Sequence, residues 1–167
     1  MARRFRGESV HKVDGKGRVS IPAPFRRVLE DGDPDWKPGE KPNLVLVYGR
    51  KGRNCLEGYS VRSMEKVDDM ISALPRFAPQ REALERMLNS QSVDGQVDEN
   101  GRLVLKPQLR ERFGLFDEAL FAGMGEKFQI WEPGAYAEDQ ARIEEWVEAQ
   151  DEENDPFALL DTSHGRG

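Results

Sequence analysis

Apolar residues recur along this chain at the two spacings that are typical of strands and of helices. Residues 18–21 and 102–105 alternate apolar with other side chains, which predicts two half-buried strands. Longer apolar runs occur in pairs separated by short glycine-containing segments, and each pair predicts a β-hairpin. The pairs are LVLVY (44–48) with NCLEGY (54–59), and LFAGMG (120–125) with KFQIW (127–131).

Segments that are predicted to be helical follow each group of predicted strands. Pro22 and Pro107 end the alternating segments and suit the first turn of a short helix, and Gly114 is placed to cap the second of these helices. Ser60 is a candidate N-cap for a longer helix. Apolar residues at helical spacing predict longer helices over 61–74, 79–89 and 135–149.

The chain contains an internal repeat. VDGKGRVSIPAPFR (13–26) aligns without gaps with VDENGRLVLKPQLR (97–110), at a constant offset of 84 and with five of fourteen positions identical. Both copies begin with a glycine-containing turn sequence, continue as the alternating strand and end in the short helix. We therefore predict a duplication, with an N-terminal unit over 1–78 and a C-terminal unit over 79–149.

Two segments have no counterpart in the repeat. Residues 30–43, EDGDPDWKPGEKPN, are rich in turn-forming residues and absent from the second copy, so we expect a surface loop. Residues 150–167 are acidic and contain little core-forming material, and we expect this tail to be disordered.

Charge is distributed unevenly along the 167 residues. The net charge is −6, yet residues 1–27 hold eight cations against two acids, whereas residues 117–167 hold three cations against fourteen acids. A basic segment in an acidic protein indicates one end that meets a polyanion, and the alternative is a solvated charged face with an acidic tail.

Composition argues against catalysis. The two histidines, His11 and His164, are too few for a histidine-based triad or a structural zinc site. GRKGR (49–53) lacks the spacing of a nucleotide-phosphate loop, and the carboxylates near 138–155 follow exposed faces. We therefore predict no enzymatic activity, no metal, no cofactor and no small-molecule substrate.

Two further observations predict the cellular location of the protein. A single cysteine, Cys55, excludes an intramolecular disulfide and fits a reducing cytosol, and we interpret it as a buried strand residue rather than a reactive thiol. No apolar run is long enough to span a membrane, and no apolar segment follows the basic start as in a signal peptide. We expect a cytoplasmic protein with no membrane partner.

A DNA-binding surface is the site that remains. Lys16, Gly17 and Arg18 form a glycine-rich tip whose N–H groups and cationic side chains suit DNA phosphates, and arginine also pairs with guanine. An alternative is that Arg18 pairs with Asp14 and braces the turn, and we expect both roles. The second copy keeps the bracing residues Asp98, Gly101 and Arg102, to which we assign a structural role. Only the first copy adds a basic flank, and we include in the DNA-binding set its members Arg3, Arg4, Arg6 and Lys12.

These residues resemble the MraZ family of bacterial transcriptional regulators. The resemblance rests on FRGESVHKVDGKGRVSIPAPFR (5–26), the second Asp-x-x-x-Arg motif at 98–102, CLEGY (55–59) and ISALP (71–75), and it extends to about residue 147. One Asp-x-x-x-Arg motif alone would indicate only the wider AbrB/SpoVT group. The chain departs from the family pattern in its residues before FRG, in the long 30–43 insertion, and in Lys106, which stands where proline is common.

The resemblance implies an α+β fold of duplicated swapped-hairpin, AbrB-like β-barrel units with flanking helices. It also implies a ring-like homo-oligomer that is cytoplasmic and associated with the nucleoid. Its DNA partner would be direct repeats upstream of the division and cell wall gene cluster, including the regulator's own gene. By position, Arg6, Lys16 and Arg18 correspond to the DNA-contacting cations and Asp14 to the acid of the motif.

Two other classes of function stay open. One is a protein-interaction module such as an AbrB-type antitoxin that neutralises a toxin through its tail. Antitoxins of that group usually carry one copy of the repeat, so the duplication disfavours this alternative. The other is an enzyme that uses the carboxylate-rich C-terminal region, which the absence of a histidine or metal constellation disfavours.

Overall fold

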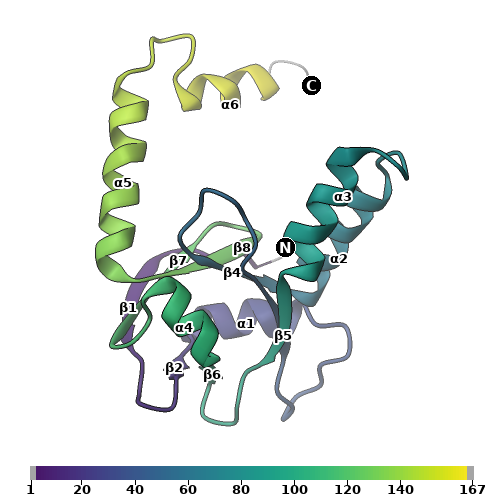
Figure 1. Cartoon of the computed structure of the whole chain (residues 1–167), viewed down its shortest axis with the longest axis vertical. Helices are drawn as coiled ribbons and strands as arrows, with labels where there is room; N and C mark the ends of the chain where they lie inside the picture. The colour runs from purple at the N-terminus through teal and green to yellow at the C-terminus, as the bar shows by residue number, and fades with distance from the viewer. Residues whose placement is uncertain (1–2, 165–167) are drawn as a thin grey trace. The chain divides into compact units, whose positions relative to one another are not determined.

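The computed structural model describes residues 3–164 and divides into two compact units, residues 1–133 and 134–167. The first unit contains a six-stranded antiparallel sheet in the order β1-β7-β8-β4-β3-β5 and a two-stranded pair, β2-β6 (Figure 1). The strands are β1 (Glu8–Lys12), β2 (Arg18–Ser20), β3 (Asn43–Val47), β4 (Leu56–Ser60), β5 (Ser92–Gln96), β6 (Arg102–Val104), β7 (Glu118–Gly123) and β8 (Lys127–Trp131). The predicted α+β class is confirmed, and so are both hairpins, β3–β4 and β7–β8.

Strand pairing joins the two halves of the repeat throughout the first unit. β1, from the first half, pairs with β7, and β5, from the second half, pairs with β3. The β2–β6 pair aligns Arg18 with Val104 and Ser20 with Arg102, so the register is symmetric about Val19 and Leu103. The compact unit therefore ends at residue 133 and includes both parts of the duplication, so a division at residue 78 does not separate two independent bodies.

The core lies between the strands and the two short helices. Four phenylalanine rings from separate elements form its centre, with Phe5 5.3 Å from Phe25 and 5.0 Å from Phe128 between ring centroids. Phe121 completes the cluster, and all four side chains are at most 3% exposed. Edge-to-face contacts at these distances stabilise aromatic pairs beyond the area that they bury.

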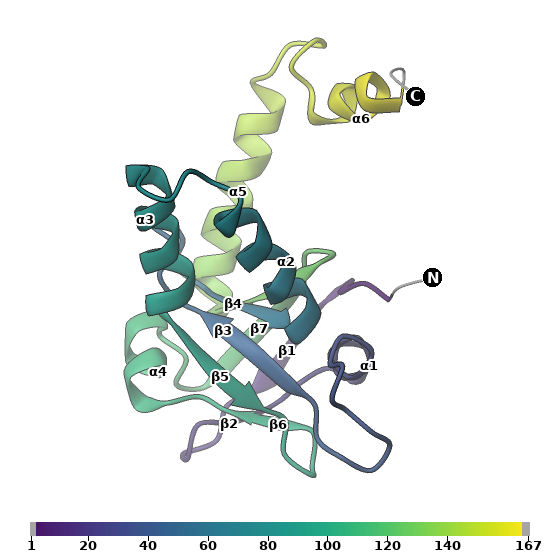
Figure 2. The same cartoon turned by 90° about the vertical axis from the view of Figure 1, so that its right-hand side faces the viewer.

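The helices of the first unit begin where the sequence predicts. α1 (Ala23–Asp31) and α4 (Pro107–Phe113) follow β2 and β6, and Gly114 ends α4 with a φ of 68°. α2 (Val61–Ser72) begins at Ser60, whose Oγ accepts a hydrogen bond of 3.1 Å from the Ser63 amide. α2 packs on β3 and β4, and α3 (Pro79–Glu85) lies alongside it (Figure 2). The predicted 79–89 helix continues past α3 as a π-helical segment, η1 (Arg86–Ser90).

The loop predicted over 30–43 begins inside α1 and ends at the first residue of β3, and residues 32–42 contain no helix or strand. It is anchored by Asp33, which is 5% exposed. The Asp33 carboxylate accepts hydrogen bonds from the Asn43 amide at 2.9 Å and from the Asp35 amide at 3.0 Å. The insertion is therefore an exposed loop that is fixed at its base.

The second unit contains α5 (Pro133–Glu148), whose first residue belongs to the first unit, and α6 (Pro156–His164). α5 matches the predicted 135–149 helix. α6 lies where the sequence predicts disorder, and its start has a physical cause: Pro156 occupies the first turn and Asp155 Oδ1 accepts a 2.9 Å hydrogen bond from the Phe157 amide. Phe157 and Leu159 on this helix are 75% and 72% exposed.

Candidate nucleic-acid interface

The first repeated turn is held by the carboxylate of Asp14. Its Oδ1 accepts hydrogen bonds from the backbone amides of Lys16 at 3.0 Å and Arg18 at 2.8 Å. Its Oδ2 accepts a 2.6 Å hydrogen bond from Arg18 Nε. Gly17, with a φ of 82°, closes the turn by donating to the Asp14 carbonyl at 2.9 Å. Asp14 therefore fixes the backbone of the tip and one edge of the Arg18 guanidinium.

The second repeated turn has the same backbone arrangement. Asp98 Oδ1 accepts from the amides of Asn100 and Arg102, each at 2.8 Å, and Gly101 has a φ of 75°. Arg102 Nε lies 3.4 Å from Asp98 Oδ2, so this ion pair is looser than that of the first copy. The expected Asp–Arg pairing within both turns is thus present.

These hydrogen bonds lower the pKa of both aspartates. The hydrogen bond from the Arg18 backbone is the largest cause of the shift of the Asp14 pKa to about 2 from its usual 3.8. The pKa of Asp98 is also lowered, mainly by the hydrogen bond from the Arg102 backbone. Both carboxylates are therefore ionised at neutral pH and hold their turns as charged acceptors.

Each turn is also locked by the other half of the chain. The Ile21 amide donates to the Gly101 carbonyl at 2.9 Å, and the Leu105 amide donates to the Gly17 carbonyl at 2.7 Å. Both turns lie at the same end of the first unit, at the bottom of Figure 1. The two tips are therefore presented together by one antiparallel pair of strands, β2 and β6.

Two arginines that contact the repeated turns, and that the sequence analysis did not single out, are Arg26 and Arg110. A Cβ on Gly101 would lie 2.7 Å from Arg26 Cζ, and one on Gly17 would lie 2.8 Å from Arg110 Nε. Each helix arginine thus packs against the turn glycine of the other copy. The signal was available in the sequence, because this arginine is one of the five identical positions of the repeat.

The predicted DNA-binding cations divide into two groups. Lys12, Lys16 and Arg18 lie at the first turn, where both lysines are exposed and, in the described part of the chain, have no acidic partner. Arg6 is exposed at the far end of β1. Arg3 and Arg4 lie farther still, where Arg3 Nε is 3.3 Å from Asp31 and Arg4 Nη1 is 3.4 Å from Glu126.

The described residues also bear on a metal site, a membrane helix, the cysteine and His11. Among residues 3–164 no group of three or more histidine, cysteine or acidic side chains is placed to hold a metal ion. Over the same residues, no helix combines the length and apolar character that a membrane span requires. Cys55 is buried, as predicted, but it lies directly before β4 rather than in a strand. His11 lies in β1 with Nε2 2.8 Å from Ser9 Oγ.

The geometry defines a class of protein: a duplicated α+β chain that interleaves its halves and presents two glycine turns, one of them cationic, at one end. Comparison with known proteins gives the family. The family model described as "MraZ protein, putative antitoxin-like" matches residues 4–87 and 90–157. This chain belongs to the MraZ family.

Two named relatives align with nearly the whole chain. A protein of Ruegeria pomeroyi named transcriptional regulator MraZ is 52% identical over 166 residues, which cover 99% of both chains. A protein of the same name from Ruegeria sp. strain TM1040 is 51% identical with the same coverage. A more distant one, from Parvibaculum lavamentivorans, is 37% identical and covers 80% of this chain and 78% of its own.

Proposed function

We propose that this chain is a sequence-specific DNA-binding transcriptional regulator without enzymatic activity, whose DNA-binding face is the first repeated turn. The observation that carries the proposal is the state of Arg18. Its Nε is occupied by Asp14, its side chain is 35% exposed, and its two terminal nitrogens have no hydrogen bond to a described residue. Those two nitrogens present the pair of donors that a guanine edge or a phosphate accepts.

The surroundings of Arg18 support the same assignment. Lys16 and Lys12 flank it as exposed cations, and the relatives are named transcriptional regulators. Phosphate contacts from lysine position a protein on DNA, whereas arginine contacts to base edges add sequence preference. We assign Gly17 to the interface because it brings the backbone of the tip close to the ligand, and Arg6 as an outlying contact.

The second turn serves as scaffold in this proposal. Asn100 stands in the place of Lys16, and Glu99 in the place of Gly15 adds an exposed acid that repels phosphate. Asp98, Gly101 and Arg102 then maintain the strand pair that holds the first turn.

Two finer assignments belong to the same proposal. The exchange of β1 and β5 between halves supports the swapped-hairpin, AbrB-like fold. We also propose a ring-like homo-oligomer in the nucleoid that binds direct repeats upstream of the division and cell wall gene cluster, including its own gene. Several weak cationic faces on repeated sites gain affinity through effective concentration, which compensates for an acidic chain.

Fluorescence anisotropy with DNA from upstream of the chain's own gene tests the proposal, using wild type, Arg18→Ala and Arg102→Ala over a salt series. We expect a negative slope of log affinity against log salt, and a loss of about tenfold to a hundredfold in specific affinity for Arg18→Ala. Equal affinity of folded Arg18→Ala and wild type would show that the site is assigned wrongly. Arg102→Ala is the matched control, since it removes the same pairing from the turn assigned to scaffold.

An antitoxin-like protein-interaction module is the second candidate, favoured by the description of the family model and by the exposed Phe157 and Leu159 of α6. It predicts that Phe157→Ala with Leu159→Ala abolishes capture of a partner protein while specific DNA binding is unchanged. DNA binding that depends on Arg18, without partner capture, favours the regulator.

A further inference from the structure

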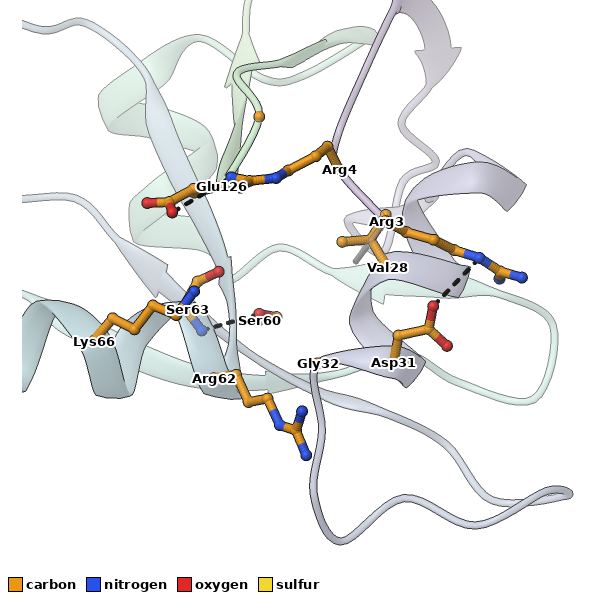
Figure 3. A pocket seen from close by; sticks show the side chains of 11 residues that line it. Arg3, Arg4, Val28, Asp31, Gly32, Ser60, Arg62, Ser63, Lys66 and Glu126 are labelled. Carbon is orange, nitrogen blue, oxygen red and sulfur yellow. Dashed lines mark hydrogen bonds and ion pairs between the residues drawn. The ribbon is translucent and has the colours of Figure 1, made fainter. Parts of the chain in front are cut away.

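A second cationic feature lies apart from the repeated turns. A cavity of about 470 Å³ opens between the N-terminal segment, the end of α1 and the start of α2 (Figure 3). Its lining includes the cations Arg3, Arg4, Arg62 and Lys66 and the hydroxyl residues Ser60 and Ser63. Cavities of this volume accommodate small ligands.

The charges that line this cavity are not balanced. Arg3 and Arg4 are paired with Asp31 and Glu126, as the dashed contacts in Figure 3 show. Each of these contacts uses one nitrogen of a guanidinium, which leaves further N–H donors. Arg62 and Lys66 have no acidic partner among residues 3–164. Among the described lining residues, four cations therefore face two acids.

The distribution of charge along α2 adds a second, independent observation. Arg62 and Lys66 stand four residues apart near the start of the helix, on one face, and the first turn contains no acid. The acids of α2 all follow Arg62: Glu65 directly precedes Lys66, and Asp68 and Asp69 stand toward the end of the helix. The helix dipole favours the opposite arrangement, with acids first and cations last. An anion bound beside Arg62 and Lys66 would offset the repulsion between these cations and the helix start.

We propose that this cavity binds phosphate groups, with Arg62 and Lys66 as the principal ligands and the Ser63 hydroxyl as a further donor. Guanidinium, ammonium and hydroxyl groups are the donors that phosphate oxygens accept. Among the described residues that line the cavity, Val28 is the only one with an apolar side chain, and none has an aromatic ring to stack on a base. The cavity therefore recognises the anion rather than an attached ring, and the source is a free phosphate compound or the DNA backbone.

Titration calorimetry of the full chain with inorganic pyrophosphate tests the first source. We expect saturable binding to wild type that weakens at least tenfold in the double variant Arg62→Ala, Lys66→Ala. The control is Lys37→Ala with Arg76→Ala, which removes two exposed cations that do not line the cavity and should change affinity less than twofold. Circular dichroism checks that each variant is folded, and Lys66→Gln alone is the milder substitution if the double variant is not.

Anisotropy with the upstream DNA tests the second source. If the DNA backbone fills the cavity, the double variant loses about tenfold in DNA affinity relative to the control while pyrophosphate does not bind. If a free phosphate compound fills it, pyrophosphate binds and the two variants bind DNA alike. The inference is overturned if pyrophosphate does not bind and DNA affinity is equal, or if both variants weaken equally. Arg18→Ala reports on the turn separately, so a failure of one assignment is distinguishable from a failure of the other.

Discussion

The two repeated turns share a backbone and differ in what they present to solvent. Both are closed by an aspartate that accepts two backbone amides, and both place a glycine at positive φ. The first carries Lys16 at its tip with Lys12 beside it, whereas the second carries Glu99 and Asn100. Shared residues therefore maintain the geometry, and unshared residues identify the copy that meets a ligand.

The largest expected effect comes from adding a methyl group to the turn glycines. In Gly17→Ala the new Cβ would overlap the Leu105 carbonyl, which belongs to the backbone and does not move aside easily, and the residue would keep a φ of 82°. We expect the free energy of unfolding to fall by about 2–4 kcal/mol. Gly101→Ala should cost less, about 1–3 kcal/mol, since it meets the Arg26 guanidinium, a side chain.

Urea unfolding monitored by circular dichroism measures both changes. Gly15→Ala is the matched control, because nothing lies within 4 Å of its added Cβ and its φ is not positive. It should alter stability by less than about 1 kcal/mol. Equal stability of Gly17→Ala and Gly15→Ala would contradict the close approach of the two halves.

Exchanging Lys16 and Asn100 between the two turns tests which turn binds DNA. Lys16→Asn gives the first turn the residue of the second, and we expect a loss of about tenfold in DNA affinity and a salt slope that is smaller by about 0.9. Asn100→Lys in that background should not restore affinity, since Glu99 and Gln96 remain beside it. Anisotropy over a salt series measures both, and full restoration would make the two turns equivalent.

Acid should weaken the first turn more than the second. Because the folded pKa of Asp14 is depressed to about 2, its contribution to stability is complete above its usual 3.8 and is lost as pH falls toward 2. Asp14→Asn removes this dependence, so wild type should lose stability more steeply than the variant between these values. Unfolding with urea at a series of pH values checks this, with Asp98→Asn as the control that shows a smaller difference. A larger difference for Asp98→Asn would reverse the comparison.

The smallest expected effect concerns the acidic tail. Residues 150–167 are rich in acids, so this segment differs in the sign of its charge from the basic start of the chain. A chain shortened to end at residue 149 should bind nonspecific DNA about twofold to fivefold more tightly, because repulsion between the tail and DNA phosphates is removed. Anisotropy with a random duplex measures this change. Unchanged affinity would show that the tail does not oppose nonspecific association.

The sequence predicted most helices, strands and turns, because each of them depends on residues that are neighbours in the chain. The Asp–Gly–Arg spacing predicted both turns, Pro22 and Pro107 predicted the short helices, and Ser60 predicted the start of α2. The tail helix was missed, since its composition is acidic and the Asp155–Pro156 start was outweighed by the charges around it.

Contacts between the halves were not predictable residue by residue. The position of Arg26 against Gly101 depends on the symmetric pairing of β2 with β6, which no local pattern contains. For the same reason the basic start was treated as one cluster. The structure instead separates Arg3 and Arg4 from Lys16 by the length of β1 and brings them beside Arg62 and Lys66.

The exchange of first strands has a consequence for how the chain folds. Glu8 of β1 pairs with Ala122 of β7. β1 therefore has no partner strand until nearly all of the first unit has left the ribosome. Contacts so distant in sequence require the closure of a long loop before they stabilise anything, which slows folding. The N-terminal half alone would expose the edges of β3 and β1, and unpaired edges favour aggregation. Duplication with exchange thus makes completion of synthesis a condition for reaching the native state.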